Sequence, residues 1–174
     1  MKDNVIYWSK VKKNAIIPTK DDENAGYDIY ACFDEDEFII PAHETKLVPT
    51  GIASAISNKY YLQIEERGST GSKGIKKSAG VIDSGYRGEW FIAITNTNNK
   101  NIIISKLDYD NDSETVKNNI IYPYKKAIAQ AVIHFVPTLE SIEIPYEELK
   151  KFTSERMDSK LGGSGKWILM QNHA

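Results

Sequence analysis

The chain has 174 residues, of which 41% are hydrophobic and 26% charged, and this composition is typical of one soluble globular domain. The formal net charge of −2 lacks the basic excess of nucleic-acid-binding proteins, and no apolar run is long enough to span a bilayer, so we expect no stable binding to nucleic acid or membrane. The single cysteine, Cys32, excludes an intramolecular disulfide and favours a reducing compartment. Because the first residues also lack the pattern of a secretory leader, we expect a cytoplasmic protein.

Apolar residues that alternate with polar ones predict short β-strands along most of the chain. Turn residues such as Pro41-Ala42 and Pro49-Thr50-Gly51 separate these strands. The expected strands span residues 4–12, 27–32, 37–40, 45–57, 60–66, 80–82, 89–96, 101–106 and 127–135. Many short strands with little helix favour an all-β sandwich, barrel or jelly roll.

Two helices and two peripheral segments complete the expected elements. Residues 69–75 predict one short helical turn, and residues 145–160 predict a helix that begins with Pro145, carries glutamates early and lysines later. Residues 108–119 are rich in Asp and Asn and predict a surface loop or the tip of an extended hairpin. Residues 162–166 are rich in Gly and Ser and predict the start of a C-terminal tail, 162–174.

The stretch 79–90, with the sequence AGVIDSGYRGEW, is the strongest candidate for a functional site. Two β-rich runs joined at Ser84-Gly85 predict a β-hairpin. Glycines there allow a ligand to approach the main chain, because no Cβ stands in the way. Asp83 beside such a pocket could orient and deprotonate a water.

Residues 66–74 predict an anion-binding junction between a strand and a short helix, where free N–H groups accumulate. Arg67 adds a fork of donors for phosphate oxygens, and Ser69 and Thr70 add hydroxyls. The spacing of glycine and lysine excludes a Walker P-loop. We expect Asp83 to lie nearby, which favours phosphate as the anion.

Two further polar residues lie within apolar strand patterns. Asp28 needs a partner there, which could be a cation, an arginine or backbone donors. Gln130 could donate a hydrogen bond to neighbouring main chain or reach a ligand phosphate.

Five segments, in chain order, resemble the motifs of the homotrimeric dUTP pyrophosphatases (dUTPases). They spread from Ala25 to Gly165, and the third is the most specific. The segments are Ala25-Gly26-Tyr27-Asp28-Ile29-Tyr30-Ala31, Arg67-Gly68-Ser69-Thr70-Gly71, Gly80-Val81-Ile82-Asp83-Ser84-Gly85-Tyr86-Arg87-Gly88-Glu89, Ala129-Gln130 and Gly162-Gly163-Ser164-Gly165.

The resemblance implies a fold, an assembly and a reaction. The fold would be a distorted jelly roll, or β-clip, of mostly antiparallel strands. Residues 1–174 would form a single domain, whose tail 162–174 completes the active site. Three copies would build a homotrimer with three shared active sites. The enzyme would be a dUTP diphosphatase, which uses Mg²⁺ to hydrolyse dUTP to dUMP and pyrophosphate, and so removes dUTP and supplies the precursor of dTTP.

The resemblance also implies roles for individual residues. Asp83 would activate the attacking water, and Tyr86 would lie beneath the deoxyribose. Asp28 would support the metal region through water or a partner residue. The main chain of the hairpin would read the uracil edge at Gly80, Val81 and Ile82. The phosphates would be bound by Arg67, Gly68, Ser69 and Gln130.

The sequence departs from the family pattern in the second and fifth motifs. Gly68 stands where the family has a serine, and Ser164 stands where the family has a phenylalanine that stacks on uracil. Our hypothesis is that Trp167 replaces this stacking ring and that Lys166 contacts phosphate.

Two alternative functions compete with this interpretation, and a purely structural jelly-roll subunit is a third possibility, which the five ordered motifs disfavour. A dCTP deaminase of the same fold would need a glutamate at the position of Ala93, a serine at Gly68 and an arginine at Ser72, so the sequence disfavours it. A nucleotide-binding regulatory module that acts through partner proteins is suggested by the loop 108–119 and the altered fifth motif. The presence of Asp83 argues against this second alternative.

Overall fold

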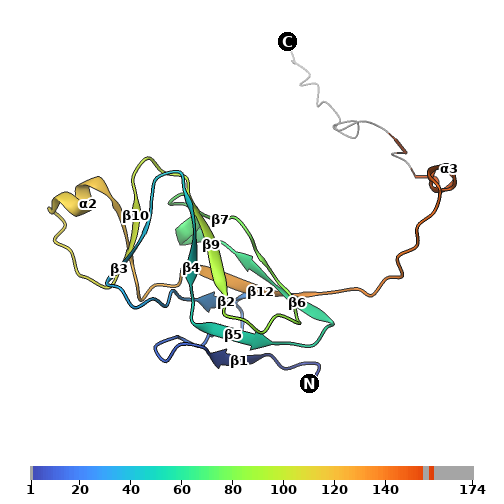
Figure 1. The fold of residues 1–174 in the computed structure, drawn as a ribbon, viewed down its shortest axis with the longest axis horizontal. Helices are drawn as coiled ribbons and strands as arrows, with labels where there is room; N and C mark the ends of the chain where they lie inside the picture. The colour runs from blue at the N-terminus through green and yellow to red at the C-terminus, as the bar shows by residue number, and fades with distance from the viewer. Residues whose placement is uncertain (1, 155–156, 159–174) are drawn as a thin grey trace, which may run out of the picture. The chain divides into compact units, whose positions relative to one another are not determined.

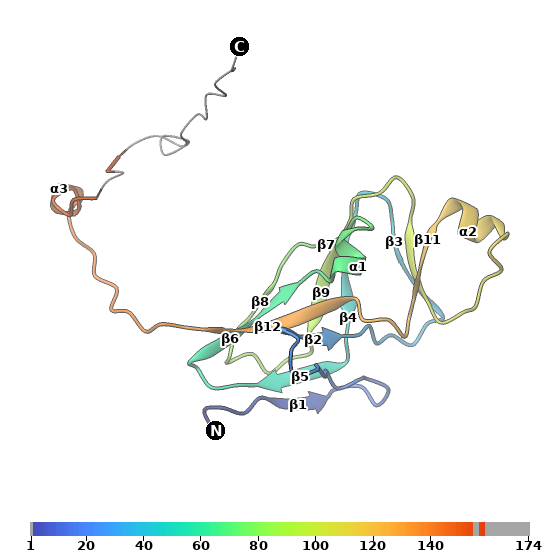
Figure 2. The same ribbon diagram turned by 180° about the vertical axis from the view of Figure 1, so that it is seen from behind.

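The computed structural model describes residues 2–154 and 157–158. Two compact units make up the chain, residues 1–138 and residues 139–174. The first unit contains every strand of the described chain, as Figures 1 and 2 show from two sides. Of the predicted site residues, Lys166 and Trp167 lie outside the described residues, as does the segment 162–166. No helix of the described residues is long and apolar enough to cross a membrane.

The first unit is built from four small sheets. In one sheet, β1 (Tyr7–Lys10) pairs antiparallel with β5 (Ile52–Ala55). A second sheet has the order β4-β9-β7 and consists of β4 (Thr45–Pro49), β9 (Phe91–Asn96) and β7 (Ile75–Lys77). Both pairings in this second sheet are antiparallel.

The third sheet has three strands, two of which are connected through a helix. It has the order β11-β10-β3 and consists of β3 (Glu37–Ile40), β10 (Ile102–Ser105) and β11 (Ile120–Pro123). The strands β10 and β11 are parallel, and α2 (Glu114–Asn118) lies in the connection between them. A parallel pair needs such a crossover, because a tight turn can join only antiparallel strands.

The fourth sheet carries the candidate site. It has the order β2-β12-β6-β8 and consists of β2 (Gly26–Ile29), β12 (Ala129–Phe135), β6 (Tyr60–Glu65) and β8 (Val81–Ile82). The short helix α1 (Gly68–Gly71) follows β6. Almost all strand pairs are antiparallel, and the all-β jelly-roll class expected from the sequence is confirmed.

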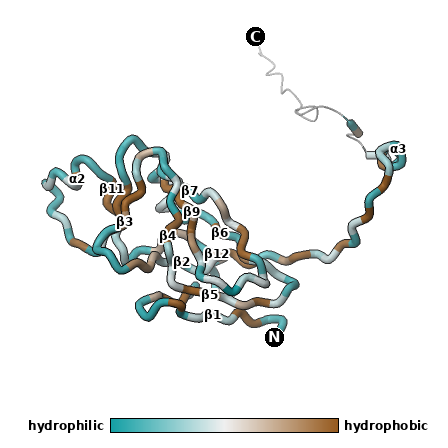
Figure 3. The backbone as a smooth tube through the Cα atoms, viewed as in Figure 1, coloured by the Kyte–Doolittle hydropathy of each residue, from teal (hydrophilic) through white to brown (hydrophobic). Residues whose placement is uncertain are grey.

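One hydrophobic core holds these sheets together. Trp90 and Tyr122 are its largest fully buried side chains, and the Trp8 ring meets Trp90 edge-on at 5.1 Å between centroids. Each such side chain contributes on the order of 1.5–3 kcal/mol by leaving water. In β10, three consecutive isoleucines are buried, and Figure 3 shows the hydrophobic colour along this part of the chain.

The segment 45–57, expected to be one strand, forms β4 and β5 with a break at Thr50-Gly51. Gly51 has a φ of +66°, and a Cβ there would lie 2.9 Å from both Ala15 Cβ and Cys32 Sγ. Only glycine fits this conformation and this space without strain. The expected strands also omitted β7 and β11, which are short and pair with distant residues.

The helices differ from expectation in two places. The loop predicted over 108–119 contains α2, where the Ser113 side chain accepts a hydrogen bond from the Val116 N–H at 3.3 Å as an N-cap. The helix predicted over 145–160 is wrong in extent, because α3 spans only Tyr146–Leu149 and residues 150–154 are not helical. The side chains of Tyr146 and Leu149 in α3 are 63% and 53% exposed, so the described residues give this helix little of the packing that stabilises short helices.

Candidate active site

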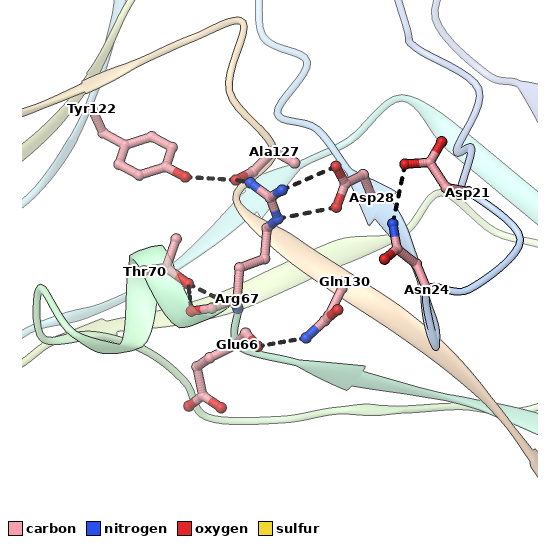
Figure 4. A network of polar contacts seen from close by, with 9 residues as sticks. All are labelled: Asp21, Asn24, Asp28, Glu66, Arg67, Thr70, Tyr122, Ala127 and Gln130. Atoms are coloured by element: carbon pink, nitrogen blue, oxygen red, sulfur yellow. Dashed lines mark hydrogen bonds and ion pairs between the residues drawn. The ribbon is translucent and has the colours of Figure 1, made fainter.

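A polar pocket of about 370 Å³ lies where β2, β12 and the loop after β6 meet. Figure 4 shows the polar contacts of this region. The structure brings together here the predicted residues Asp28, Arg67, Gly68, Ser69 and Gln130. These residues come from three segments of the chain that are far apart in sequence, so the pocket forms only in the folded chain.

An ion pair between Arg67 and Asp28 forms one wall of the pocket. Arg67 Nε lies 3.0 Å from Asp28 Oδ1, and Nη2 donates to Oδ2 at 3.2 Å. Arg67 Nη1 donates to the main-chain oxygen of Ala127 at 3.5 Å. Among the three partners considered for Asp28, the structure therefore selects arginine. A guanidinium has five N–H donors, so Arg67 keeps one on each Nη nitrogen for a ligand oxygen.

Gln130 lies beside Asp28, its register partner on β2. The Gln130 side-chain amide donates to the Glu66 main-chain oxygen at 2.9 Å, which is the main-chain interaction considered from the sequence. Gln130 Oε1 is 2.9 Å from the point that a Cβ on Gly26 would occupy. A glycine at position 26 therefore gives the Gln130 side chain its room in the pocket.

The loop that carries Arg67 is fixed by the side chain of Thr70, which is 1% exposed and does not line the pocket, so the prediction that its hydroxyl meets phosphate was wrong. Its hydroxyl oxygen accepts from the Arg67 N–H at 3.0 Å and lies 2.9 Å from the Arg67 carbonyl oxygen, to which it donates. The Thr70 and Gly71 N–H groups both donate to the same carbonyl. The N–H groups of Gly68 and Ser69, the first two residues of α1, have no partner within the helix, so they can bind an anion.

The stretch 79–90 is not the regular β-hairpin that its pattern predicts. The strand β8 pairs with β6, whereas β9 pairs with β4 and β7. The two arms are joined at their base, where the Ser78 N–H donates to the Ala93 oxygen at 2.9 Å, and then belong to different sheets. The prediction of a paired hairpin was wrong because each arm finds a partner elsewhere in the fold.

Asp83 lies at the exposed end of this stretch, and its carbonyl accepts from the Tyr86 N–H at 3.1 Å. Its neighbouring strand β8 forms the opposite edge of the sheet from β2, with β12 and β6 between them. Asp83 therefore does not line the polar pocket around Arg67 in its own chain. The sequence suggested that the two features lie together, and a single chain does not bring them together.

The returning arm positions Tyr86. The Tyr86 hydroxyl donates to the Glu89 oxygen at 2.9 Å, and its ring packs on Gly88, where a Cβ would lie 2.7 Å from Cζ. The Glu89 carboxylate accepts a hydrogen bond from the Gly51 N–H at 2.8 Å. The main-chain N–H of Trp90 donates to the main-chain oxygen of Ile52 at 2.9 Å. The β4–β5 turn thus anchors the arm that carries Tyr86.

The sequence reasoning missed two residues of the pocket region. Asn24 lines the pocket directly before the first motif, and its polar character within a turn was the available signal. Tyr122 donates to the Ala127 oxygen at 2.6 Å, and burial raises the pKa of its hydroxyl. Nothing in the local sequence around Tyr122 indicates this contact.

Comparisons with known proteins identify the relatives of the chain. A family model described as dUTPase matches residues 12–108, which is more than half of the chain. The chain belongs to the dUTPase family. Two deoxyuridine 5'-triphosphate nucleotidohydrolases, from Nautilia profundicola and Debaryomyces hansenii, are each 32% identical to it. The matches cover 90% and 88% of this chain, and 96% and 79% of the two relatives.

Solved dUTPase structures share the fold. The dUTPase of Staphylococcus bacteriophage 80alpha with dUPNHPP has a TM-score of 0.68 at 24% identity, and the match covers 94% of this chain and 99% of that one. The native EIAV dUTPase has a TM-score of 0.59 at 21% identity, over 81% and 97% of the two chains. At this identity the likeness concerns the fold.

Proposed function

We propose that this dUTPase-family chain hydrolyses dUTP to dUMP and pyrophosphate. The observation that carries the proposal is the pocket in which Arg67 is already oriented by Asp28 beside open main-chain N–H groups. The choice of dUTP as the nucleotide is based on the family of the chain and on relatives named for dUTP hydrolysis.

The pocket binds the phosphate chain. Arg67 offers its two remaining N–H groups to phosphate oxygens, and the Gly68 and Ser69 amides add uncharged donors. In phosphoryl transfer, charge spreads over these oxygens, so donors that are fixed before the reaction stabilise the transition state. Because Asp28 already fixes the guanidinium, little reorganisation is needed when the nucleotide binds.

Magnesium fits this pocket through phosphate and water rather than through a cluster of side chains. The described residues contain no group of three or more His, Cys, Asp or Glu side chains suited to a metal. Asp28 is the carboxylate of the pocket and is engaged by Arg67, so it would contact the ion through water. Mg²⁺ commonly keeps several waters and binds substrate phosphates together with one or two carboxylates. When bound, it would neutralise phosphate charge.

The divergent arms of the stretch 79–90 receive the base and sugar. Their main-chain groups at Gly80, Val81 and Ile82 would meet the uracil edge, and cytosine would leave donors and acceptors unpaired. The Tyr86 ring, fixed on Gly88, would lie beneath the deoxyribose and exclude a 2′-hydroxyl. Asp83 would accept the proton of the attacking water.

A complete site requires more than one copy of the chain. Asp83 is outside the phosphate pocket of its own chain, so a second copy must bring its stretch 79–90 to that pocket. This supports an oligomer with shared active sites, which we propose is the homotrimer that the resemblance implies. Trp167 as the stacking ring and Lys166 as a phosphate contact remain predictions.

The deaminase alternative would need a carboxylate at position 93. Ala93 is only 7% exposed within β9, where the side chain is a methyl group packed in the sheet. The structure therefore offers no acid there.

Pyrophosphate release tests the proposal. The purified full chain is incubated with Mg²⁺ and dUTP, and in parallel with UTP, dTTP and dCTP, while pyrophosphate and ammonia are measured. We expect pyrophosphate from dUTP and little from the other three. Equal rates with UTP, or ammonia from dCTP, would contradict the proposed function.

A further inference from the structure

We propose that Tyr122 is a positioning residue for the phosphate-binding Arg67 and acts through the main-chain carbonyl of Ala127. The inference rests on the proposed function, because it concerns the affinity of the same pocket for a triphosphate. Tyr122 lies on β11, which belongs to another sheet, and it does not line the pocket.

The contact geometry connects the three residues in a chain. The Tyr122 hydroxyl donates to the Ala127 oxygen at 2.6 Å, and Arg67 Nη1 donates to the same oxygen at 3.5 Å. Figure 4 shows Arg67 between this carbonyl on one side and Asp28 on the other. The guanidinium is therefore oriented from two sides, by a charged partner and by a carbonyl.

Burial and strand pairing hold Tyr122 in place, so its hydroxyl can fix the position of the Ala127 carbonyl. Tyr122 is 1% exposed in the hydrophobic core, and its main chain is in register with Ile104 on β10. The hydroxyl spans the turn between β11 and β12, where the Lys126 N–H donates to the Pro123 oxygen at 3.0 Å. It thereby sets the position of the chain directly before β12, which carries Gln130 into the pocket.

The direction of this hydrogen bond is fixed by chemistry. A carbonyl oxygen can only accept, so the Tyr122 hydroxyl must be protonated to make the bond. Burial raises the pKa of Tyr122, so the hydroxyl is a donor throughout the neutral range.

The variant Tyr122→Phe removes this donor and keeps the aromatic ring in the core. Without it, the Ala127 carbonyl would be left to Arg67, whose guanidinium would shift toward it and away from its orientation in the pocket. We expect the affinity for the dUTP analogue dUpNHpp to fall about fivefold, which is the effect of roughly one net hydrogen bond. The affinity for deoxyuridine should not change, since the nucleoside has no phosphate to meet Arg67.

The chain offers a matched control, Tyr124→Phe. Tyr124 lies in the same turn, but its ring packs on Phe33, at 5.0 Å between centroids. Loss of this hydroxyl should leave both affinities unchanged.

Calorimetry on the full chain tests the inference with dUpNHpp and deoxyuridine as probes. The proteins are the wild type, Tyr122→Phe, Tyr124→Phe, Arg67→Ala and the double variant of Tyr122 and Arg67. If Tyr122 acts through Arg67, Tyr122→Phe weakens dUpNHpp only where Arg67 is present. Equal losses for both ligands, or the same loss without Arg67, would show a merely structural role and overturn the inference. Unchanged dUpNHpp binding by Tyr122→Phe would also overturn it, whereas a wild type that binds no dUpNHpp would overturn the proposed function.

Discussion

Replacing Asp28 with asparagine tests whether the ion pair with Arg67 organises the phosphate pocket. Asp28→Asn keeps the size of the side chain but removes its charge and one of the two acceptors that face Arg67. The two contacts measure 3.0 and 3.2 Å, which lie within the usual range of N–H···O hydrogen bonds.

The expected loss of stability in Asp28→Asn depends on how exposed the Asp28–Arg67 pair is to solvent. A hydrogen bond to a charged group contributes about 1.5–3 kcal/mol when buried, and exposed pairs contribute about 0–1 kcal/mol. The two side chains are 29% and 32% exposed, so an intermediate cost of about 1.5 kcal/mol is expected. For a domain of this size, that cost corresponds to a fall in Tm of about 3–6 °C. A guanidinium that is no longer oriented should bind a triphosphate about tenfold more weakly.

Thermal unfolding and calorimetry with dUpNHpp measure the two effects. Glu44→Gln is the matched control, because the Glu44–Lys46 pair lies at the surface with exposures of 52% and 45%. The control should change neither Tm nor affinity. If Asp28→Asn matched the wild type in both measurements, the ion pair would not organise the pocket and the reasoning would be refuted.

Three further predictions concern single residues. Gly26→Ala would place a Cβ 2.9 Å from Gln130 Oε1, so the Gln130 side chain should be displaced. We expect dUpNHpp to bind this variant about tenfold more weakly, whereas the affinity for deoxyuridine, the control, should stay constant. Gly88→Ala would place a Cβ 2.5 Å from the Tyr86 hydroxyl and so displace the ring. We expect kcat/KM for dUTP to fall by about 10- to 100-fold, while the far-UV circular dichroism is retained. An unchanged kcat/KM would argue against a role for the Tyr86 ring. Burial raises the pKa of Tyr122 above its unfolded value, so its contribution is fully present below about pH 10 and is lost as pH rises through the folded pKa. The difference in Tm between wild type and Tyr122→Phe should therefore shrink above about pH 10, and a constant difference would contradict this assignment.

The sequence predicted the fold class because alternation of apolar and polar residues is a local property of each strand. It could not predict which strands pair. Two apolar runs around Ser84-Gly85 have the pattern of a hairpin, yet β8 pairs with β6 and β9 with β4 and β7. Likewise, charge placement after Pro145 predicted a helix longer than α3, because helix length also depends on tertiary packing that a local pattern does not contain.

The same distinction applies to the site. The resemblance placed Asp28, Arg67 and Gln130 in one phosphate region, and the structure brings their side chains to one pocket. It did not indicate Tyr122, because its role depends on the turn that brings its hydroxyl to Ala127. Nor could the sequence indicate that Asp83 lies away from the pocket of its own chain, because this depends on the order of strands in the sheet.

The most direct test of the central claim is the turnover of dUTP by Asp83→Asn. This change removes the proposed general base and leaves Arg67 and its pocket in place. The account predicts that kcat falls by about 10²-fold or more, while dUpNHpp still binds with an affinity close to that of the wild type. A variant that turns over dUTP as fast as the wild type would contradict the account.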